Sequence, residues 1–268
     1  MSSPATVRPP QRSYVTRYRH ALWLLTKRDL RVRYSTSALG YVWSILDPLV
    51  MAGIYWFVFA VVFDRGDSVG AQPYIVFLLV GLLPWMWFNG AVSDSTRAFL
   101  REAKLVRSTS IPRTIWVNRL VLSKGIEFIA ALPVLALFAI VAGAELHWEV
   151  VFFPLAILMQ AVLTVGIGLI VAPLVVFFRD LERATKLILR FLFYASPIVY
   201  GLNDLPAELQ TLAAFNPLAG IFSLYRGAFF PDQLDWFAVA VAALMSLLFL
   251  AIGLWVFKRS ERTVLKEL

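Results

Sequence analysis

Residues 74–92 read YIVFLLVGLLPWMWFNGAV, an apolar run without a charged side chain. A helix needs about 20 predominantly apolar residues to cross a hydrocarbon core about 30 Å thick, so this run predicts a membrane span. Comparable runs recur along the 268 residues, which are 60% hydrophobic, whereas soluble domains are about 45–50% apolar. The sequence therefore predicts an all-α integral membrane protein with one transmembrane domain.

The apolar runs are long enough to predict six transmembrane helices. We expect them near residues 40–63, 74–92, 120–142, 150–178, 187–201 and 236–257. The chain then divides into a cytosolic N-terminal region (1–38), a transmembrane domain (39–258) and a cytosolic C-terminal tail (259–268).

Lysine and arginine residues are concentrated in every second connection between these spans. Of the 25 such residues, all except Arg65 and Arg226 fall in the terminal segments, in every second connection, or, for Lys124 and Arg190, in the span ends that adjoin those connections. Basic residues favour the cytosolic side of short loops, so both termini are expected in the cytosol and the number of spans is expected to be even. The net charge of +8 therefore reflects membrane topology and not nucleic-acid binding.

One further segment, TLAAFNPLAGIFSLYRGAFF at 211–230, is apolar enough to pass for a seventh span. A crossing here would place the basic C-terminal end outside and would put Asn216, Pro217 and Arg226 into lipid. We expect instead that residues 196–230 form short pieces that cap the outer exit without crossing. Three prolines punctuate this segment, namely Pro197, Pro206 and Pro217. Arg226 is expected to be hydrated at the outer boundary.

Residues 14–34 place aromatic and apolar side chains at helical spacing among basic ones. This pattern predicts an amphipathic interface helix on the cytosolic membrane surface, with a simple basic anchor to anionic lipid as the alternative.

Two carboxylates, Asp47 and Glu127, lie inside predicted spans. A charge at the centre of a span costs about 2.5–3.5 kcal/mol on insertion scales, so such residues usually face protein or water. Each is a candidate for a lumen or a helix contact, or for pairing with a nearby arginine or lysine at the cytosolic end. The RDLER sequence at 179–183 is expected to be a solvated connector with internal ion pairs.

Motifs for catalysis and nucleotide binding are missing from the sequence. The chain contains no cysteine, two distant histidines and no G-x-x-x-x-G-K-[ST] loop for ATP phosphates. Neither G-x-S-x-G nor H-E-x-x-H occurs. We therefore expect no catalytic, cofactor-binding or metal site in this chain.

Several stretches, in one order, resemble the ABC-2-type permease family, specifically the branch that exports O-antigen, teichoic acid and galactan chains. They are KRDLRVRYSTSALGYVWSILDPL (27–49), LLPWMWF (82–88), VRSTSIPR (106–113), VVFFRDLER (175–183), SPIVYG (196–201) and NPLAGIFSLYRGAFF (216–230). The resemblance implies six spans, a cytosolic interface helix and short outer helices between spans five and six. It also implies a plasma-membrane homodimer with two separate ATPase subunits, which bind ATP and Mg²⁺, and a lipid-linked glycan as substrate.

A coupling segment is expected at residues 101–118, REAKLVRSTSIPRTIWVN, as a short cytosolic helix and a turn fixed by proline. It should dock on the ATPase subunit together with residues 14–34. The candidate coupling residues are Arg101, Arg107, Ile111, Pro112 and Arg113.

The aromatic cluster after Pro84 is expected to lie deep in the membrane. At a rise of 1.5 Å per residue from Tyr74, the rings from Trp85 to Phe88 lie about 16–21 Å into the core, too deep for an interfacial belt. Pro84 should kink the span. Trp85 and Phe88 are expected to line the substrate path while Trp87 points elsewhere; alternatively, the rings fill a packing interface. Weaker candidates for the path are Tyr55, Trp56 and Tyr194.

The sequence thus favours the membrane subunit of an ATP-driven exporter of lipid-linked polysaccharide. Two alternatives are an ABC-2 exporter of a drug or small lipid, and a membrane-embedded glycan-processing enzyme. The enzyme would need a converging acid/base set, for which the spans offer only Asp47 and Glu127.

Overall fold

The computed structural model describes residues 14–35, 42–62, 71–109 and 111–267, and within them the regular elements are all helical. Four helices are long and apolar enough to cross a membrane. They are α3 (Tyr74–Ser95), α5 (Ile115–Val141), α6 (Phe153–Phe177, continuing a 3-10 turn at Trp148–Phe152) and α10 (Trp236–Glu267). The spans expected at these four places are thus confirmed as helices of sufficient length and hydropathy.

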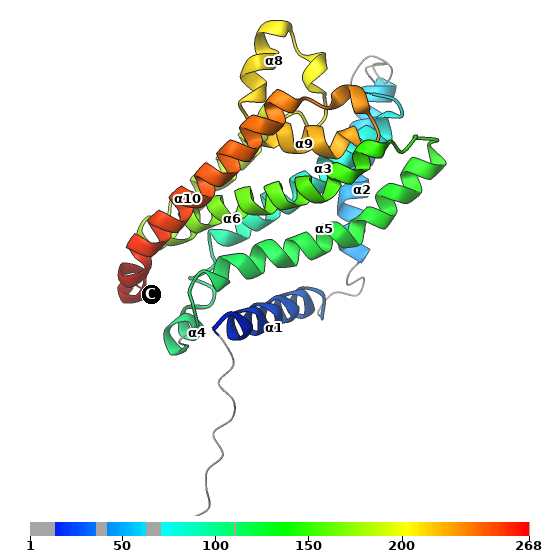
Figure 1. Cartoon of the computed structure of the whole chain (residues 1–268). Coiled ribbons are helices and arrows are strands. Elements are labelled where there is room, and N and C mark those ends of the chain that lie inside the picture. The colour runs from blue at the N-terminus through cyan, green and yellow to red at the C-terminus, as the bar shows by residue number, and fades with distance from the viewer. Residues whose placement is uncertain (1–13, 36–41, 63–70, 110, 268) are drawn as a thin grey trace, which may run out of the picture.

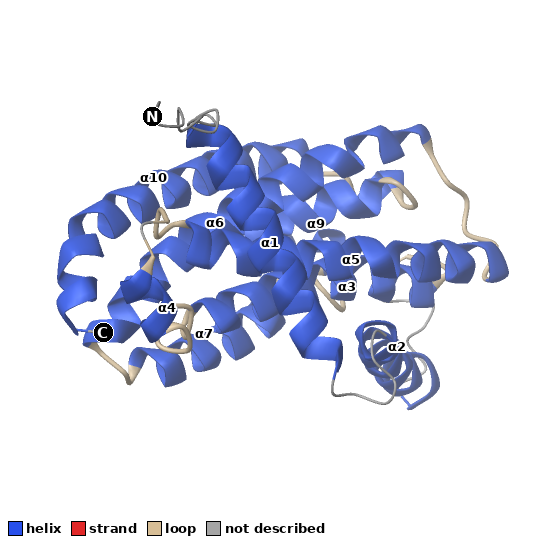
Figure 2. Ribbon diagram, turned by 90° about the horizontal axis from the view of Figure 1, so that it is seen from below, coloured by secondary structure: helices blue, strands red, loops and turns tan. Residues whose placement is uncertain are grey.

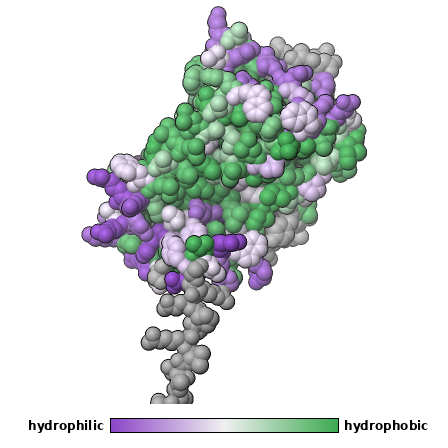
Figure 3. Space-filling model, viewed as in Figure 1, coloured by the Kyte–Doolittle hydropathy of each residue, from purple (hydrophilic) through white to green (hydrophobic). Residues whose placement is uncertain are grey.

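The four helices form an elongated bundle in which α10 packs along α6 and α3 packs along α5 (Figure 1). On the face drawn in Figure 3, apolar residues cover the middle of the molecule and polar residues gather at its two ends. This distribution is that of a membrane protein, because a bilayer solvates the middle and water solvates the ends. α10 runs without a break to Glu267, so the expected boundary between residues 258 and 259 lies inside this helix.

Glycine allows α6 and α10 to approach closely. A Cβ built on Gly253 would lie 2.3 Å from the carbonyl oxygen of Gly166, and one on Gly166 would lie 2.6 Å from the amide nitrogen of Leu250. Any larger residue at either position would force the helices apart, which is the usual role of small residues between membrane helices.

Two shorter helices complete the bundle. α2 (Val42–Trp56) continues as a π-helical stretch at Phe57–Val62, and α7 spans Leu181–Ala195. With 15 residues, α7 is about 22 Å long at 1.5 Å per residue, less than the thickness of a hydrocarbon core. The expected helical span at 187–201 is therefore corrected. The helix ends at Ala195 because Pro197 disfavours a helical conformation at Ser196, whose backbone is extended (φ −101°, ψ 147°). Six crossings remain a prediction.

We expected residues 211–230 to form short pieces, and the structure confirms that they do not form one straight helix. α8 (Ala207–Ala214) and α9 (Pro217–Gly227) are separated by a turn, and a 3-10 turn at Leu202–Asp204 precedes them. The side-chain oxygen of Asn216 accepts a hydrogen bond from the amide of Leu218 at 3.0 Å, so it caps α9, and Pro217 occupies the first turn. A 3-10 turn at Pro231–Gln233 then leads into α10.

The opposite end of the bundle carries α1 (Tyr14–Ser35) and α4 (Ala103–Ser108), which Figure 2 shows from below. The predicted helix at 14–34 is thus confirmed. α1 packs against α5, and this contact brings the basic N-terminal segment beside the start of α5.

Candidate functional site

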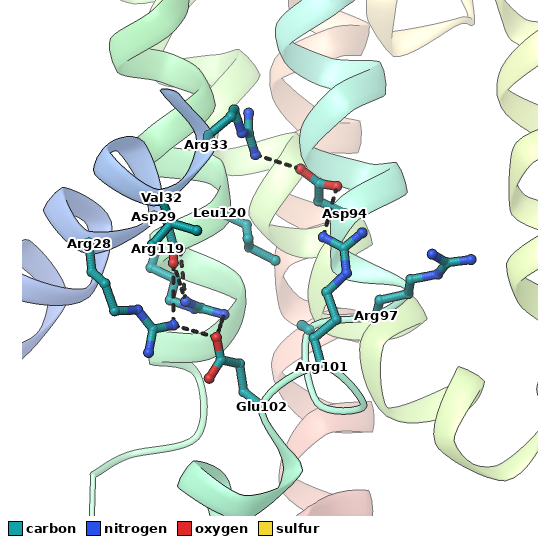
Figure 4. Close-up of a pocket in the computed structure, with 11 residues that line it drawn as sticks. Arg28, Asp29, Val32, Arg33, Asp94, Arg97, Arg101, Glu102, Arg119 and Leu120 are labelled. Atoms are coloured by element: carbon teal, nitrogen blue, oxygen red, sulfur yellow. Dashed lines mark hydrogen bonds and ion pairs between the residues drawn. The ribbon is translucent and has the colours of Figure 1, made fainter. Parts of the chain in front are cut away.

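An ion-pair cluster joins α1 to the neighbouring helices at this end. It surrounds a cavity of about 460 Å³ (Figure 4). The lining residues are Arg28, Asp29, Val32, Arg33, Asp94, Arg97, Ala98, Arg101, Glu102, Arg119 and Leu120. Figure 4 shows the three carboxylates, Asp29, Asp94 and Glu102, among five arginines, so part of the positive charge is compensated within the cavity.

Asp29 of α1 and Arg119 of α5 form the buried centre of the cluster. One terminal nitrogen of Arg119 donates to both carboxylate oxygens of Asp29, at 2.6 and 2.8 Å. Burial raises the pKa of Asp29, and the charges of Arg119 and Arg28 oppose that rise. Glu102 accepts a hydrogen bond from Arg28 and lies 3.7 Å from Arg119. The pair therefore fixes α1 on α5 and on the segment before α4.

Arg33 makes a second bridge from α1. It donates to Asp94 on α3 at 2.9 Å and to Glu127 on α5 at 2.7 Å, while Lys124 donates to Glu127 at 2.9 Å. Of the alternatives for Glu127, the structure thus shows pairing with nearby cations. Asp47 is exposed on α2 and pairs with no residue among those described.

The ion pairs expected within the RDLER connector (179–183), which the structure describes in full, are not observed; its Glu182 pairs with residues outside the connector. Glu182 accepts hydrogen bonds from Arg97 at 2.5 Å and from Lys186 at 2.7 Å, both outside residues 179–183. No ion pair closes within that stretch among the described side chains. The fold places the end of α3 beside the start of α7. Glu182 therefore pairs with Arg97, which lies just after α3.

The coupling segment lies against α1. α4 and the turn at Pro112 precede α5, and a cavity of about 190 Å³ is lined jointly by Ile111, Pro112 and the start of α1. The side-chain amide of Asn118 donates to the hydroxyl of Tyr18 at 2.7 Å. Residues 14–34 and 101–118 therefore form one continuous surface.

The candidate cations of this segment differ in their surroundings. Arg107 is exposed and pairs with no described residue. Arg101 reaches Asp94, and Arg113 reaches Glu261 on α10, each at 3.8 Å. Arg107 is thus the candidate whose charge is open to a partner protein.

An aromatic groove of about 530 Å³ lies between α2, α3 and α7. Its lining residues are Met51, Tyr55, Leu82, Trp85, Met86, Asn89, Ser93, Lys186, Leu189, Arg190, Phe193 and Tyr194. Tyr55 stacks on Phe193 with ring centroids 5.6 Å apart, and Trp85 meets Phe193 edge-on at 5.5 Å. A cavity of this size is typical of a ligand site.

Three of the five residues expected along the path line this groove, namely Tyr55, Trp85 and Tyr194. Trp56 is 44% exposed and lies outside it, and Phe88 is only 1% exposed, with its ring behind Trp85 at 5.8 Å. Trp87 faces α5, where its indole nitrogen donates to the carbonyl of Val121 at 3.0 Å. The five residues therefore do not share one surface in the protomer.

Four polar residues line the groove, namely Asn89 and Ser93 on α3 and Lys186 and Arg190 on α7, and sequence reasoning overlooked the last three. Each pair is spaced i, i+4, on α3 and on α7 respectively, so both members face the same way. The signal was present in LILRFLFYA, where Arg190 interrupts an apolar run.

Pro84 does not end α3, which continues as one helix to Ser95. The carbonyl oxygen of Pro84 accepts a hydrogen bond from the side-chain amide of Gln160 on α6 at 2.7 Å, and Gln160 is fully buried. This hydrogen bond gives the buried amide of Gln160 a partner and joins α6 to α3.

At the opposite end, Arg226 holds the irregular segment after α7. It is 2% exposed and donates to the carbonyls of Ile198 at 2.6 Å and Tyr200 at 3.0 Å. Tyr74 donates to the intervening carbonyl of Val199 at 2.8 Å. The expectation that Arg226 is hydrated is therefore wrong: carbonyl oxygens replace water because the extended backbone after Pro197 has no helical partner for them.

Two further contacts complete this clamp. The guanidinium of Arg226 lies 3.7 Å from the ring centre of Phe77, in cation–π geometry. A Cβ on Gly81 would lie 2.7 Å from the carbonyl oxygen of Ile198, so only glycine permits this approach. Asn216 also donates to the hydroxyl of Ser196 at 2.8 Å, and thereby fixes α9 to the end of α7.

Among the described residues, no group of three or more histidine, aspartate or glutamate side chains lies close enough together to hold a metal ion. The architecture, with apolar helices, a lateral groove and a basic end, is that of a membrane transport subunit.

Comparison with known proteins identifies the family. Residues 20–230 match the model of the ABC-2 type transporter family, and the chain belongs to that family. It is 33% identical over 240 residues to the O-antigen export system permease protein RfbA of Klebsiella pneumoniae, covering 89% of this chain and 91% of that protein. It is 29% identical over 250 residues to the protein of the same name from Myxococcus xanthus, covering 91% and 94%. The polysialic acid transport protein KpsM of Escherichia coli is 25% identical over 246 residues, covering 89% and 92%.

Proposed function

We propose that this chain is the transmembrane subunit of an ABC exporter that moves lipid-linked polysaccharide across the plasma membrane. The observation that carries the proposal is the likeness, over nearly the whole length of both chains, to permeases named for O-antigen export. The aromatic groove adds independent support. Aromatic faces give a sliding sugar chain apolar contact with its C–H surfaces, and they bind no single unit tightly.

The working assembly is a homodimer of this permease with two ATPase subunits. ATP and Mg²⁺ are bound by those subunits, because this sequence has no P-loop. Ile188 and Phe191 on the outward face of α7 are 57% and 70% exposed, so this face is free to contact the second copy. In this assembly α2 and α7 complete six crossings, and both termini lie in the cytosol.

The functional test is depletion of the permease in its native host. Lipid-linked glycan should then accumulate on the cytosolic face of the membrane, while its synthesis continues. A drug or small-lipid exporter would leave glycan distribution unchanged. A glycan-processing enzyme would instead leave chemically unmodified glycan on the outer face.

Topology is tested by cysteine labelling, which is direct because the chain has no native cysteine. Cysteine at Asp232, which is exposed next to α10, should react with an impermeant thiol reagent added outside intact cells. Cysteine at Ser108 or Ser260 should react only after permeabilisation, since the excess of basic residues holds that end in the cytosol. A second outer position, Ser68, lies outside the described residues. The reverse labelling pattern would contradict the proposed orientation.

Coupling to the ATPase subunit is tested at Arg107. Charge reversal with Arg107→Glu should weaken assembly or ATPase stimulation about fivefold at most, since an exposed ion pair contributes ~0.2–1 kcal/mol. Membrane insertion should be unchanged. Arg113 needs a different design because it already faces Glu261. The swap of Arg113→Glu with Glu261→Arg preserves this contact and separates it from docking. Full coupling in the Arg107 variant would count against docking through α4.

A further inference from the structure

Arg190 differs from the arginines of the ion-pair cluster, which have acidic partners. It is exposed on the amphipathic helix α7 and lines the aromatic groove. Among the described residues, no carboxylate or carbonyl pairs with it. Arginines of the ion-pair cluster, by contrast, have acidic partners, as Arg33 and Arg119 illustrate. An ionisable side chain that lacks an acidic partner within a membrane domain usually marks a ligand site or a transport pathway.

The groove has the charge of an anion site. Lys186 lies one turn before Arg190 on the same face of α7, and no carboxylate occurs among the described residues lining the groove. Lys186 is held by Glu182 from outside the groove at 2.7 Å. On the facing helix α3, Asn89 and Ser93 add neutral hydrogen-bonding groups. The groove therefore presents Arg190, which has no described acidic partner, Lys186, whose charge is shared with Glu182, and two neutral polar groups.

The polar and aromatic parts follow one another along the groove. α3 ends where α7 begins, as the hydrogen bond from Arg97 to Glu182 shows, so these two helices run antiparallel. Ser93 and Lys186 therefore lie nearest the end that carries α1. Trp85 and Phe193, in edge-on contact at 5.5 Å, lie deeper in the bundle.

We propose that Arg190 and Lys186 bind the phosphate of the lipid carrier while the adjoining sugar contacts the ring of Trp85. The inference rests on the proposed function, and it assigns the entry point for the substrate within the groove. The guanidinium suits this task because its planar fork can donate two parallel hydrogen bonds to phosphate. Ordinary anionic phospholipids carry the same chemical group, so the experiment must separate the two sources.

Asp47 offers a competing account of Arg190. It precedes Met51 by one turn on α2 and therefore shares a helical face with this groove residue. If Arg190 only neutralised Asp47, removing both charges would be harmless. If Arg190 binds phosphate, removing Asp47 would not rescue the loss of Arg190. A double-variant comparison thus decides between them.

The test uses the complete exporter, permease with ATPase subunit, in nanodiscs of zwitterionic lipid. Polyprenyl diphosphate is titrated, and binding is measured together with ATPase stimulation. Arg190→Gln should weaken binding about tenfold or more, because charge-assisted hydrogen bonds are lost. Arg190→Lys should recover part of the affinity, and Lys186→Gln provides a second variant should Arg190→Gln fail to assemble. Arg183→Gln is the matched control, since Arg183 is exposed on the same helix and lies outside the groove.

Four outcomes are decisive. Equal affinity in the wild type, Arg190→Gln and Lys186→Gln would overturn the inference while leaving the proposed function intact. Rescue of Arg190→Gln by Asp47→Asn would overturn it in favour of a structural ion pair. Equal competition by phosphatidylglycerol would assign the groove to bulk phospholipid. Failure of the wild-type complex to bind polyprenyl diphosphate or to export lipid-linked glycan would instead remove the proposed function itself.

Discussion

Replacing Trp85 with alanine should reduce glycan export about tenfold while the permease still assembles with its ATPase subunit. Trp85 lines the groove, and the loss of an aromatic contact of about 1–1.5 kcal/mol at the transported chain corresponds to ~tenfold in affinity. Because Trp85 is only 6% exposed, its truncation also leaves a cavity that costs about 3–5 kcal/mol, so the amount of assembled permease is measured in parallel. Trp85→Phe keeps a ring at this position and should retain most of the export. Export is measured as surface glycan per copy of permease in the membrane.

The control for Trp85 is Trp255→Ala. Trp255 is 63% exposed on α10 and lies outside the groove, so its removal should leave export unchanged. Phe88 is changed separately, because it is 1% exposed and, unlike Trp85, does not line the groove. Its replacement by alanine creates a core cavity that costs about 3–5 kcal/mol, and the result would report stability. If Trp85→Ala prevents assembly as well, Trp85 belongs to helix packing and not to the substrate path.

Removal of the Arg226 side chain should have the largest effect on stability. Arg226→Leu leaves the carbonyls of Ile198 and Tyr200 without their donors in a buried site, and each orphaned group costs about 1–3 kcal/mol. The loss of the contact with Phe77 adds roughly 1–2 kcal/mol. We expect a lower thermal unfolding midpoint in detergent, with the loss concentrated in residues 196–230 in hydrogen exchange.

Arg226→Lys separates charge from geometry. Lysine retains the positive charge, but it cannot present the planar fork that reaches two carbonyls, so an intermediate stability is expected. Arg179→Gln is the matched control, because Arg179 is exposed and forms no ion pair with a described residue. Unchanged stability in Arg226→Leu would show that the segment after Pro197 is held without the clamp.

The role of a side chain could be predicted where its partners are neighbours in the sequence, and could not where its partners are distant. Asn216 and Pro217 marked the break between α8 and α9, because capping and the loss of an amide donor act on neighbouring residues. Arg226 was misjudged as hydrated because its partners at 198 and 200 lie 28 and 26 positions away. Nothing in the local sequence indicates that an extended segment delivers carbonyl oxygens to it.

The sequence by itself determined the hydrophobic helices, the amphipathic N-terminal helix and the basic end of the molecule. These features follow from hydropathy, helical periodicity and proline position, which are properties of contiguous residues. Only the tertiary structure decided that Glu127 pairs with Arg33, 94 positions away, and that Tyr74 supports Val199, 125 positions away. It also decided that Trp85, although only 6% exposed, lines the groove while Phe88 lies behind it. The physical reason is that apolar patterning selects which segments become helices, whereas the angle and register at which they pack select the partners of each polar side chain.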